Sequence, residues 1–215
     1  MSQNWLSLVG ADAIPETLEE RSSGTHYEIE RSDGKPCAMQ ARFRNIDGVG
    51  IAALSGNYAV HATSRIDSSA LTLTFVTNGP MAISPGVGRH DVDAGEGDCL
   101  VIPFKEGTLA RIAPEGTKLV VDVPDSVVRD ILSRHFHIDP PRRIDWHPIV
   151  RRDQSNLHLL QRLIVNAHDT LEAIEADDIT SNQAILAGQY RDLIVSSLLL
   201  TLPNSLTDAL SKNND

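Results

Sequence analysis

Hydrophobic and polar residues alternate in short runs through the first half of the chain, and turn residues separate the runs. Residues 70–77, ALTLTFVT, are the clearest case. Leu71, Leu73 and Phe75 lie on one face, and Thr72, Thr74 and Val76 lie on the other. A period of two is typical of a β-strand. Strands are predicted at residues 27–31, 37–45, 49–54, 59–64, 70–77, 81–84, 90–92, 99–103, 108–113 and 118–123. Because no helical pattern interrupts them, they predict an antiparallel barrel or sandwich.

The hydrophobic period changes to three or four residues after Pro124. Pro124-Asp125-Ser126 predicts the start of a helix with a capping residue. Two long amphipathic patterns follow, and the short acidic connection at residues 175–181, where Thr180 or Ser181 is placed to cap the second helix, predicts an antiparallel hairpin. Its wide apolar face must be covered by the barrel, by a second copy of the chain, or by both. The residues expected at a dimer interface are Leu157, Leu160, Leu163, Ile164, Leu171, Leu186, Tyr190 and Leu193.

The two ends of the chain differ from the middle in their pattern of apolar and polar residues. Residues 1–24 mix apolar side chains with acidic ones and predict an arm or short helix laid against the core, with Trp5 as its anchor. Residues 205–215 are mostly polar and are predicted to begin a linker.

A glycine-rich turn lies between the runs at residues 90–92 and 99–103. Gly95 and Gly97 tolerate positive φ angles, and Asp98 can bond the nearby backbone. We expect this turn to feed a buried strand of the barrel wall.

Charge and cysteine content narrow the classes of protein that fit. The 29 acidic residues exceed the 19 basic ones and give a net charge of −10, which disfavours broad contact with nucleic acid. Cys37 and Cys99 are far apart and lack zinc-site spacing. The apolar run near the N-terminus is too short for a secretion signal or a membrane span, so we expect a cytoplasmic protein with reduced thiols and no membrane partner.

No catalytic or cofactor-binding motif is evident in the sequence. The chain has no GxSxG elbow and no phosphate-binding loop. The strand histidines lack the HxH pattern followed by a glutamate that a cupin-type metal site needs, so we expect no metal, no cofactor and no enzymatic activity. The alternative is a metal-dependent cupin-fold enzyme that holds its ion with His61, His90 and an acidic neighbour.

The order of arm, barrel, glycine-rich turn and helical hairpin resembles the N-terminal effector-binding and dimerisation region of AraC/XylS-type transcription regulators. Residues 97–103, GDCLVIP, match the Gly-Asp turn before an apolar strand in that family, and residues 198–204, LLLTLPN, resemble the close of its helical part. The resemblance implies an α+β fold with a cupin-like barrel at residues 25–123, followed by a helical dimerisation region at 124–204. It also implies a homodimer and a small-molecule effector. DNA would be bound only by a C-terminal helix-turn-helix module, which is absent from this chain.

Candidate pocket residues are those with mixed chemistry on the predicted strands, together with an aromatic lid from the arm. We predict Tyr58, His61, Phe75 and Arg111 in the pocket, with Trp5 as the lid. Another possibility is a stand-alone interaction domain, because small barrels are often filled by their own side chains.

Overall fold

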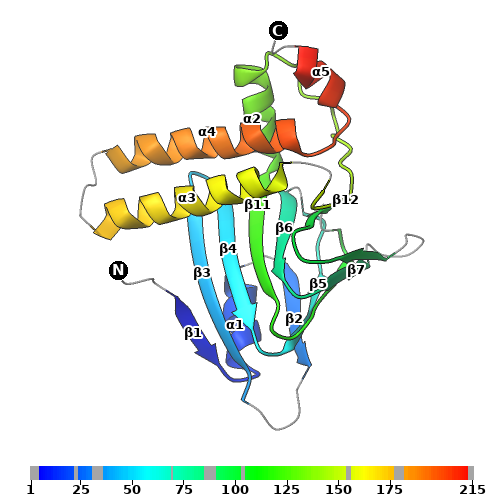
Figure 1. Cartoon of the computed structure of the whole chain (residues 1–215), viewed down its shortest axis with the longest axis vertical. Helices are drawn as coiled ribbons and strands as arrows, with labels where there is room; N and C mark the ends of the chain where they lie inside the picture. The colour runs from blue at the N-terminus through cyan, green and yellow to red at the C-terminus, as the bar shows by residue number, and fades with distance from the viewer. Residues whose placement is uncertain are drawn as a thin grey trace.

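The computed structural model describes residues 5–21, 24–30, 36–68, 70–84, 91–102, 105–153, 156–176 and 182–212. Two antiparallel sheets face each other as a cupin-like barrel, and most of the helices gather at one end of it (Figure 1). The strands are β1 (Leu6–Val9), β2 (Thr25–Glu30), β3 (Ala38–Ile46), β4 (Val49–Gly56), β5 (Ala59–Ser64), β6 (Ala70–Asn78), β7 (Met81–Ser84), β8 (Val92–Ala94), β9 (Cys99–Ile102), β10 (Leu109–Ile112), β11 (Thr117–Pro124) and β12 (Ile149–Val150). The helices are α1 (Ala13–Arg21), α2 (Asp125–His135), α3 (Leu157–Ala176), α4 (Gln183–Thr201) and α5 (Thr207–Lys212). The predicted α+β fold is confirmed.

Strand order shows how the barrel is assembled. One sheet has the order β1-β3-β4-β11-β6-β9-β12, and the other has the order β2-β5-β10-β7-β8. All ten predicted strands are present to within two residues at each end. The sequence pattern missed β1, which pairs with β3, and the two-residue strand β12, which pairs with β9.

The outer face of the seven-stranded sheet carries the main hydrophobic core. On β6, Leu71, Leu73 and Phe75 point to this face and are at most 6% exposed. Apolar residues of α2, α3 and α4 cover them, and α3 and α4 run antiparallel and side by side there (Figure 1). The alternating residues Thr72 and Thr74 therefore point into the barrel.

Helix α1 and strand β1 occupy the region predicted as an arm or short helix. Ile14 and Leu18 of α1 are at most 3% exposed and pack with Met39, Tyr58 and other residues at one end of the barrel. Trp5 lies outside this cluster, with its ring 5.3 Å from the Arg42 guanidinium carbon. Helix α1, rather than Trp5, therefore anchors this segment to the core.

The helical region differs from expectation at its boundaries. Helix α2 begins after Pro124 as predicted, but no side chain caps it, and Asp125 pairs instead with Arg129 one turn later. The caps proposed at Thr180 and Ser181 lie outside the described residues. Residues 207–212 form α5, and Leu210 is 1% exposed in the main core, so a polar linker does not begin directly at residue 205. None of the helices in the described ranges combines the length and apolarity that crossing a bilayer requires.

Candidate functional site

A cavity lies inside the barrel, between the inner faces of the two sheets. Its volume is about 360 Å³, and an overlapping cavity of about 280 Å³ extends towards α1, with Tyr27, Asn45 and Asp122 in the lining of both. Apolar side chains such as Leu54, Ala62 and Val120 make up much of the wall. A concave, largely apolar space with a few polar groups is the usual form of a small-molecule site.

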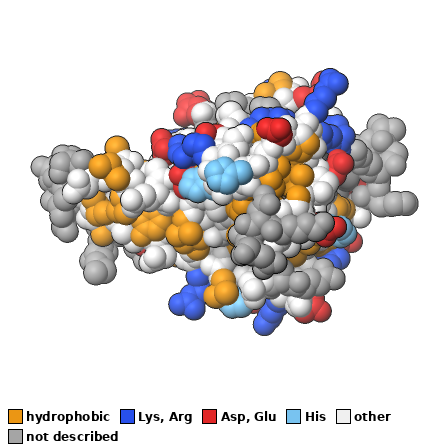
Figure 2. Space-filling view, turned by 90° about the horizontal axis from the view of Figure 1, so that it is seen from above, with side chains coloured by type: hydrophobic (Ala, Val, Ile, Leu, Met, Phe, Trp, Pro, Cys, Tyr) orange, Lys and Arg blue, Asp and Glu red, His pale blue; other side chains and the backbone are white. Residues whose placement is uncertain are grey.

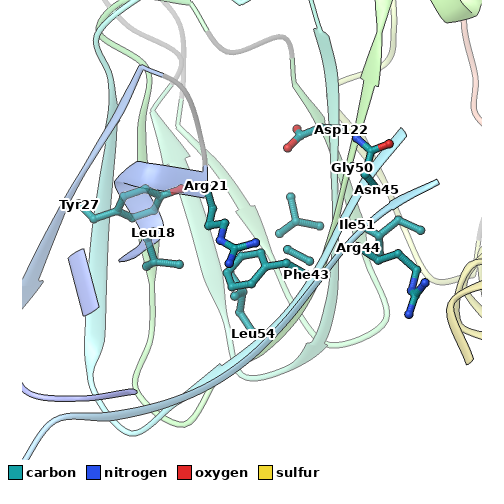
Figure 3. Close-up of a pocket in the computed structure, with 12 residues that line it drawn as sticks. Leu18, Arg21, Tyr27, Phe43, Arg44, Asn45, Gly50, Ile51, Leu54 and Asp122 are labelled. Atoms are coloured by element: carbon teal, nitrogen blue, oxygen red, sulfur yellow. The ribbon is translucent and has the colours of Figure 1, made fainter. Parts of the chain in front are cut away.

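Asp122 is the acidic group in the described lining of both cavities. It lies on the central strand β11, opposite Gly50 of β4 and Thr72 of β6, and its side chain enters the space between the sheets (Figure 3). Thr72 Oγ1 donates a hydrogen bond of 2.5 Å to Asp122 Oδ1. Burial raises the pKa of Asp122, and the bond from Thr72 opposes this shift only in part. Asp122 Oδ2 accepts no hydrogen bond from the described residues, so it can accept one from a ligand.

Arg21 brings a positive charge to the same cavities from the last turn of α1. Its guanidinium carbon lies 5.4 Å from the centre of the Phe43 ring, a cation–π arrangement that holds the side chain over the cavity (Figure 3). No described carboxylate lies within ion-pair distance of Arg21. Arg44 also borders the smaller cavity, but its side chain points away and donates to both carboxylate oxygens of Glu175 on α3, at 2.7 and 2.9 Å.

The end of the barrel against which α1 packs, called the closed end below, holds a buried lysine and a buried tyrosine. Lys118 is 1% exposed and donates to the carbonyl oxygens of Asn78 and Gly79 at 2.9 and 3.3 Å. Burial lowers the pKa of Lys118 to about 8. Lys118 and Tyr58 both border a small void of about 20 Å³. The buried hydroxyl of Tyr58 has no hydrogen-bond partner in the described structure. Burial, with a smaller contribution from Cys37, raises the pKa of Tyr58.

The five predicted pocket residues are not brought together. Phe75 is 2% exposed but faces the helices, so its placement in the pocket was wrong. His61 and Arg111 lie opposite each other on β5 and β10, and they border a shallow groove on the outer face of the five-stranded sheet. Tyr58 lies at the closed end, and Trp5 stacks on Arg42 and does not line the interior cavities. The described structure therefore does not support these residues as one ligand site.

Metal binding has little support among the described residues. His61 Nε2 lies 3.7 Å from a Glu30 carboxylate, and the other proposed ligand, His90, lies outside the described residues. His168, Asp169 and Glu172 of α3 come close enough together to hold an ion. However, Arg42 of β3 contacts all three, at 3.1 Å from His168 Nδ1, 3.2 Å from Asp169, and in a short bond to Glu172. The guanidinium thus supplies the positive charge that this cluster needs.

The glycine-rich turn before β9 has a structural role. Asp98 is 7% exposed and accepts bonds from the backbone N–H of Gly95, from the Arg151 side chain and from the backbone N–H of Arg152, at 3.0, 2.8 and 3.0 Å. Burial alone would raise the pKa of Asp98, but these bonds outweigh it and lower the pKa. Gly97 has a φ of +89°, and a Cβ there would lie 2.7 Å from Arg152 Cδ. The turn thus fixes the segment that leads from β12 to α3.

Asp122, Thr72 and Arg21 were not among the residues predicted for the site. A signal for Asp122 was available, because residues 119–123, LVVDV, place a single acidic residue among apolar ones in a strand. A carboxyl group at such a position is either paired or functional. Arg21 carries no comparable signal, since its position depends on how α1 docks onto the barrel.

One family and one solved structure are similar to this chain over most of its length. The family described as AraC-binding-like domain matches residues 24–200. The crystal structure of the AraC-like transcriptional activator CuxR is similar over 94% of this chain and 72% of that chain, with 11% identity and a TM-score of 0.54. A cupin superfamily protein from Desulfitobacterium hafniense matches 45% of this chain and 82% of its own, with 18% identity and a TM-score of 0.31. No curated protein matches the chain.

Proposed function

Since the chain belongs to the AraC-binding-like domain family, we propose that it is the ligand-sensing and dimerisation domain of an AraC-type transcription regulator. In this proposal a small molecule binds inside the barrel, two copies pair through the helical hairpin, and the bound state controls a helix-turn-helix module outside these residues. The protein would act in the cytoplasm as a regulator without catalytic activity of its own. Two helix-turn-helix units encoded beyond residue 215 are the expected genetic context.

The main support is the position of the cavity directly behind the sheet that carries the helices. Strand β3 lies between the smaller cavity and helix α3. Its residues Phe43 and Asn45 border the smaller cavity, while Arg42 and Arg44 extend from the opposite face to carboxylates of α3. A ligand that contacts the inner residues can therefore favour one position of α3 through a single strand. Such coupling requires that the ligand bind the two positions with different affinity.

Helix α4 provides the surface that we propose for dimerisation. Ile185, Leu193 and Leu200 are 65%, 50% and 49% exposed, and their spacing of eight and seven residues places them along one side of the helix. Figure 2 shows hydrophobic side chains gathered on the projecting hairpin. An exposed apolar stripe of this kind is typical of a protein–protein contact.

The predicted interface needs correction in its α3 half. Leu157, Leu160, Ile164 and Leu171 are at most 3% exposed and belong to the core of the chain itself, so they are not available to a partner. Leu163, Leu186 and Tyr190 are partly buried against that core, and Leu193 is exposed. We therefore propose an interface formed by Leu193 with Ile185 and Leu200, bordered by Leu186 and Tyr190.

The dimer is tested by charge substitution at positions of matched exposure. Leu193→Glu on α4 should convert a dimer into a monomer in sedimentation equilibrium, because it places a charge in an apolar contact. Leu159→Glu on α3, where Leu159 is 52% exposed, is the control and should leave the dimer intact. A wild-type chain that stays monomeric at the highest soluble concentration would rule out the dimer.

Sensing is tested by filling the cavity. Ala110 is 2% exposed and borders the larger cavity, so Ala110→Phe should fill part of the space that a ligand needs. Any compound that stabilises the wild type in a thermal-shift screen should lose its effect on this variant. Compounds that stabilise both proteins equally bind elsewhere, and that result would contradict sensing inside the barrel.

A further inference from the structure

Two opposite charges border the barrel cavities, and neither has an ion-pair partner among the described residues. Asp122 lies on β11 and Arg21 lies on α1, and both line both cavities. Figure 3 shows the two side chains on different sides of the space, with the Phe43 ring below the Arg21 guanidinium. They do not form an ion pair with each other. Each is thus free to bind a group of opposite charge on one ligand.

The Asp122 carboxyl group is suited to a cationic donor. Its Oδ1 accepts the bond from Thr72, and its Oδ2 accepts none from the residues that the structure describes. A partly buried carboxylate without a counter-charge is unfavourable, and the raised pKa of Asp122 reflects this cost. A bound ammonium group would supply the missing charge and hydrogen bonds together.

Arg21 is suited to a carboxylate. A guanidinium presents two parallel N–H groups that match the two oxygens of a carboxylate, and Phe43 supports the group from one side. Arg44 does not compete for the same anion, because Glu175 occupies its guanidinium. The wall between the two charged groups is mainly apolar, with Leu54 and Val120 lining both cavities.

We infer that the ligand is a small zwitterion with an ammonium group held by Asp122, a carboxylate held by Arg21, and an apolar body between them. This inference rests on the proposed sensing role of the barrel, and it adds the chemical class of the effector. Because the two protein charges come from different sides of the space, the ligand carries its charges at separate ends of its body.

The test uses four probes with the same six-carbon body. They are 6-aminohexanoate, which carries both charges, hexanoate, hexylamine, and 6-hydroxyhexanoate, in which a neutral hydroxyl replaces the ammonium. Binding to the purified protein is measured by calorimetry. We expect 6-aminohexanoate to bind more tightly than each of the other three by about tenfold or more, as expected for one charge-assisted hydrogen bond.

Substitutions that remove one charge at a time assign each end of the ligand. Asp122→Asn should weaken the binding of 6-aminohexanoate and of hexylamine by about tenfold or more and leave the binding of hexanoate unchanged. Arg21→Met should weaken the binding of 6-aminohexanoate and of hexanoate and leave the binding of hexylamine unchanged. Arg21→Lys, which keeps a positive charge, should retain part of the affinity that Arg21→Met loses. Thermal unfolding of each variant checks that the fold is retained.

The outcomes separate this inference from the sensing role itself. Failure of all four probes to bind up to about 10 mM overturns the zwitterion class, as does equal binding of 6-hydroxyhexanoate or indifference to Asp122→Asn. If other compounds still stabilise the wild type and not Ala110→Phe, the barrel remains a sensing site for a different class of ligand. If no compound distinguishes those two proteins, the sensing role fails as well.

Discussion

The two faces of the seven-stranded sheet differ in polarity and in what covers them. The outer face is apolar: Leu71, Leu73 and Phe75 pack against the helices and are at most 6% exposed. The inner face carries Thr72, Thr74 and Asp122, which border the cavities, and Lys118 at the closed end. Because side chains alternate along a strand, successive residues of β6 and β11 contribute to the two faces in turn.

This difference separates stability from ligand binding within one sheet. In many β-sandwiches the apolar faces meet between the sheets and fill that space. Here the helices cover the apolar face, so the main core forms outside the barrel and the interior retains polar groups and open volume. A binding site can then change its chemistry with little effect on the core.

The largest predicted effect is a difference in the stability lost when two neighbouring residues of β6 are replaced by alanine. Leu73→Ala on the outer face should lower the free energy of unfolding by about 2–5 kcal/mol, because it leaves a cavity in a packed core. Thr74→Ala on the inner face should cost less than about 1 kcal/mol, because its side chain already borders an open cavity. Urea unfolding of both variants measures the difference, and equal losses would contradict the division of roles between the faces.

A second prediction uses the charge at the closed end of the inner face. The pKa of Lys118 is about 8 in the folded protein against 10.5 for a free lysine, so the unfolded chain binds more protons between these values. The free energy of unfolding of the wild type should therefore gain a contribution from Lys118 as the pH rises from 8 to 10.5. With 1.36 kcal/mol per pKa unit, this contribution is about 3 kcal/mol.

Lys118→Met isolates that contribution, because it removes the titrating group and keeps an unbranched side chain. The stability of the variant minus that of the wild type should be about 3 kcal/mol larger near neutral pH than above pH 10.5. Tyr58 and Cys99, whose pKa values are raised by burial, titrate in both proteins and cancel in this difference. A difference that does not vary with pH would mean that the Lys118 ammonium is not destabilised by burial.

The sequence was informative about strands and poor at assigning their faces. The alternation in ALTLTFVT predicted β6 but could not say which face meets the barrel interior, because the covering helices lie far along the chain. The more hydrophobic face was covered by helices, and this is why Phe75 was misplaced. The helical period of α3 likewise predicted an apolar stripe, but Leu157 and Leu160 proved to be core residues rather than interface residues. A stripe alone does not identify what covers it.

The candidate site depended on contacts that no local pattern encodes. Arg21 borders the cavities only because Ile14 and Leu18 dock α1 against the end of the barrel. His61 and Arg111 were also predicted in a pocket, whereas the register puts both on the outer surface of the other sheet. The polar residue Asp122 within an apolar strand was the one local signal that pointed to the site.

The smallest predicted effect concerns that residue. Burial raises the pKa of Asp122 in the folded protein, so the folded state binds a proton at this carboxyl group more tightly than the unfolded chain does. The wild type therefore loses stability as the pH rises from the pKa of the unfolded chain to that of the folded protein. Asp122→Asn removes the charge and keeps an oxygen that can accept the Thr72 bond, so it should stabilise the protein by about 1 kcal/mol near neutral pH. Urea unfolding of the variant and the wild type at neutral pH and near pH 4 measures this gain, which should be smaller at the lower pH. A loss of stability at neutral pH would instead make Asp122 part of the scaffold, whereas a gain accompanied by weaker ligand binding would show that this charge is retained at the expense of stability.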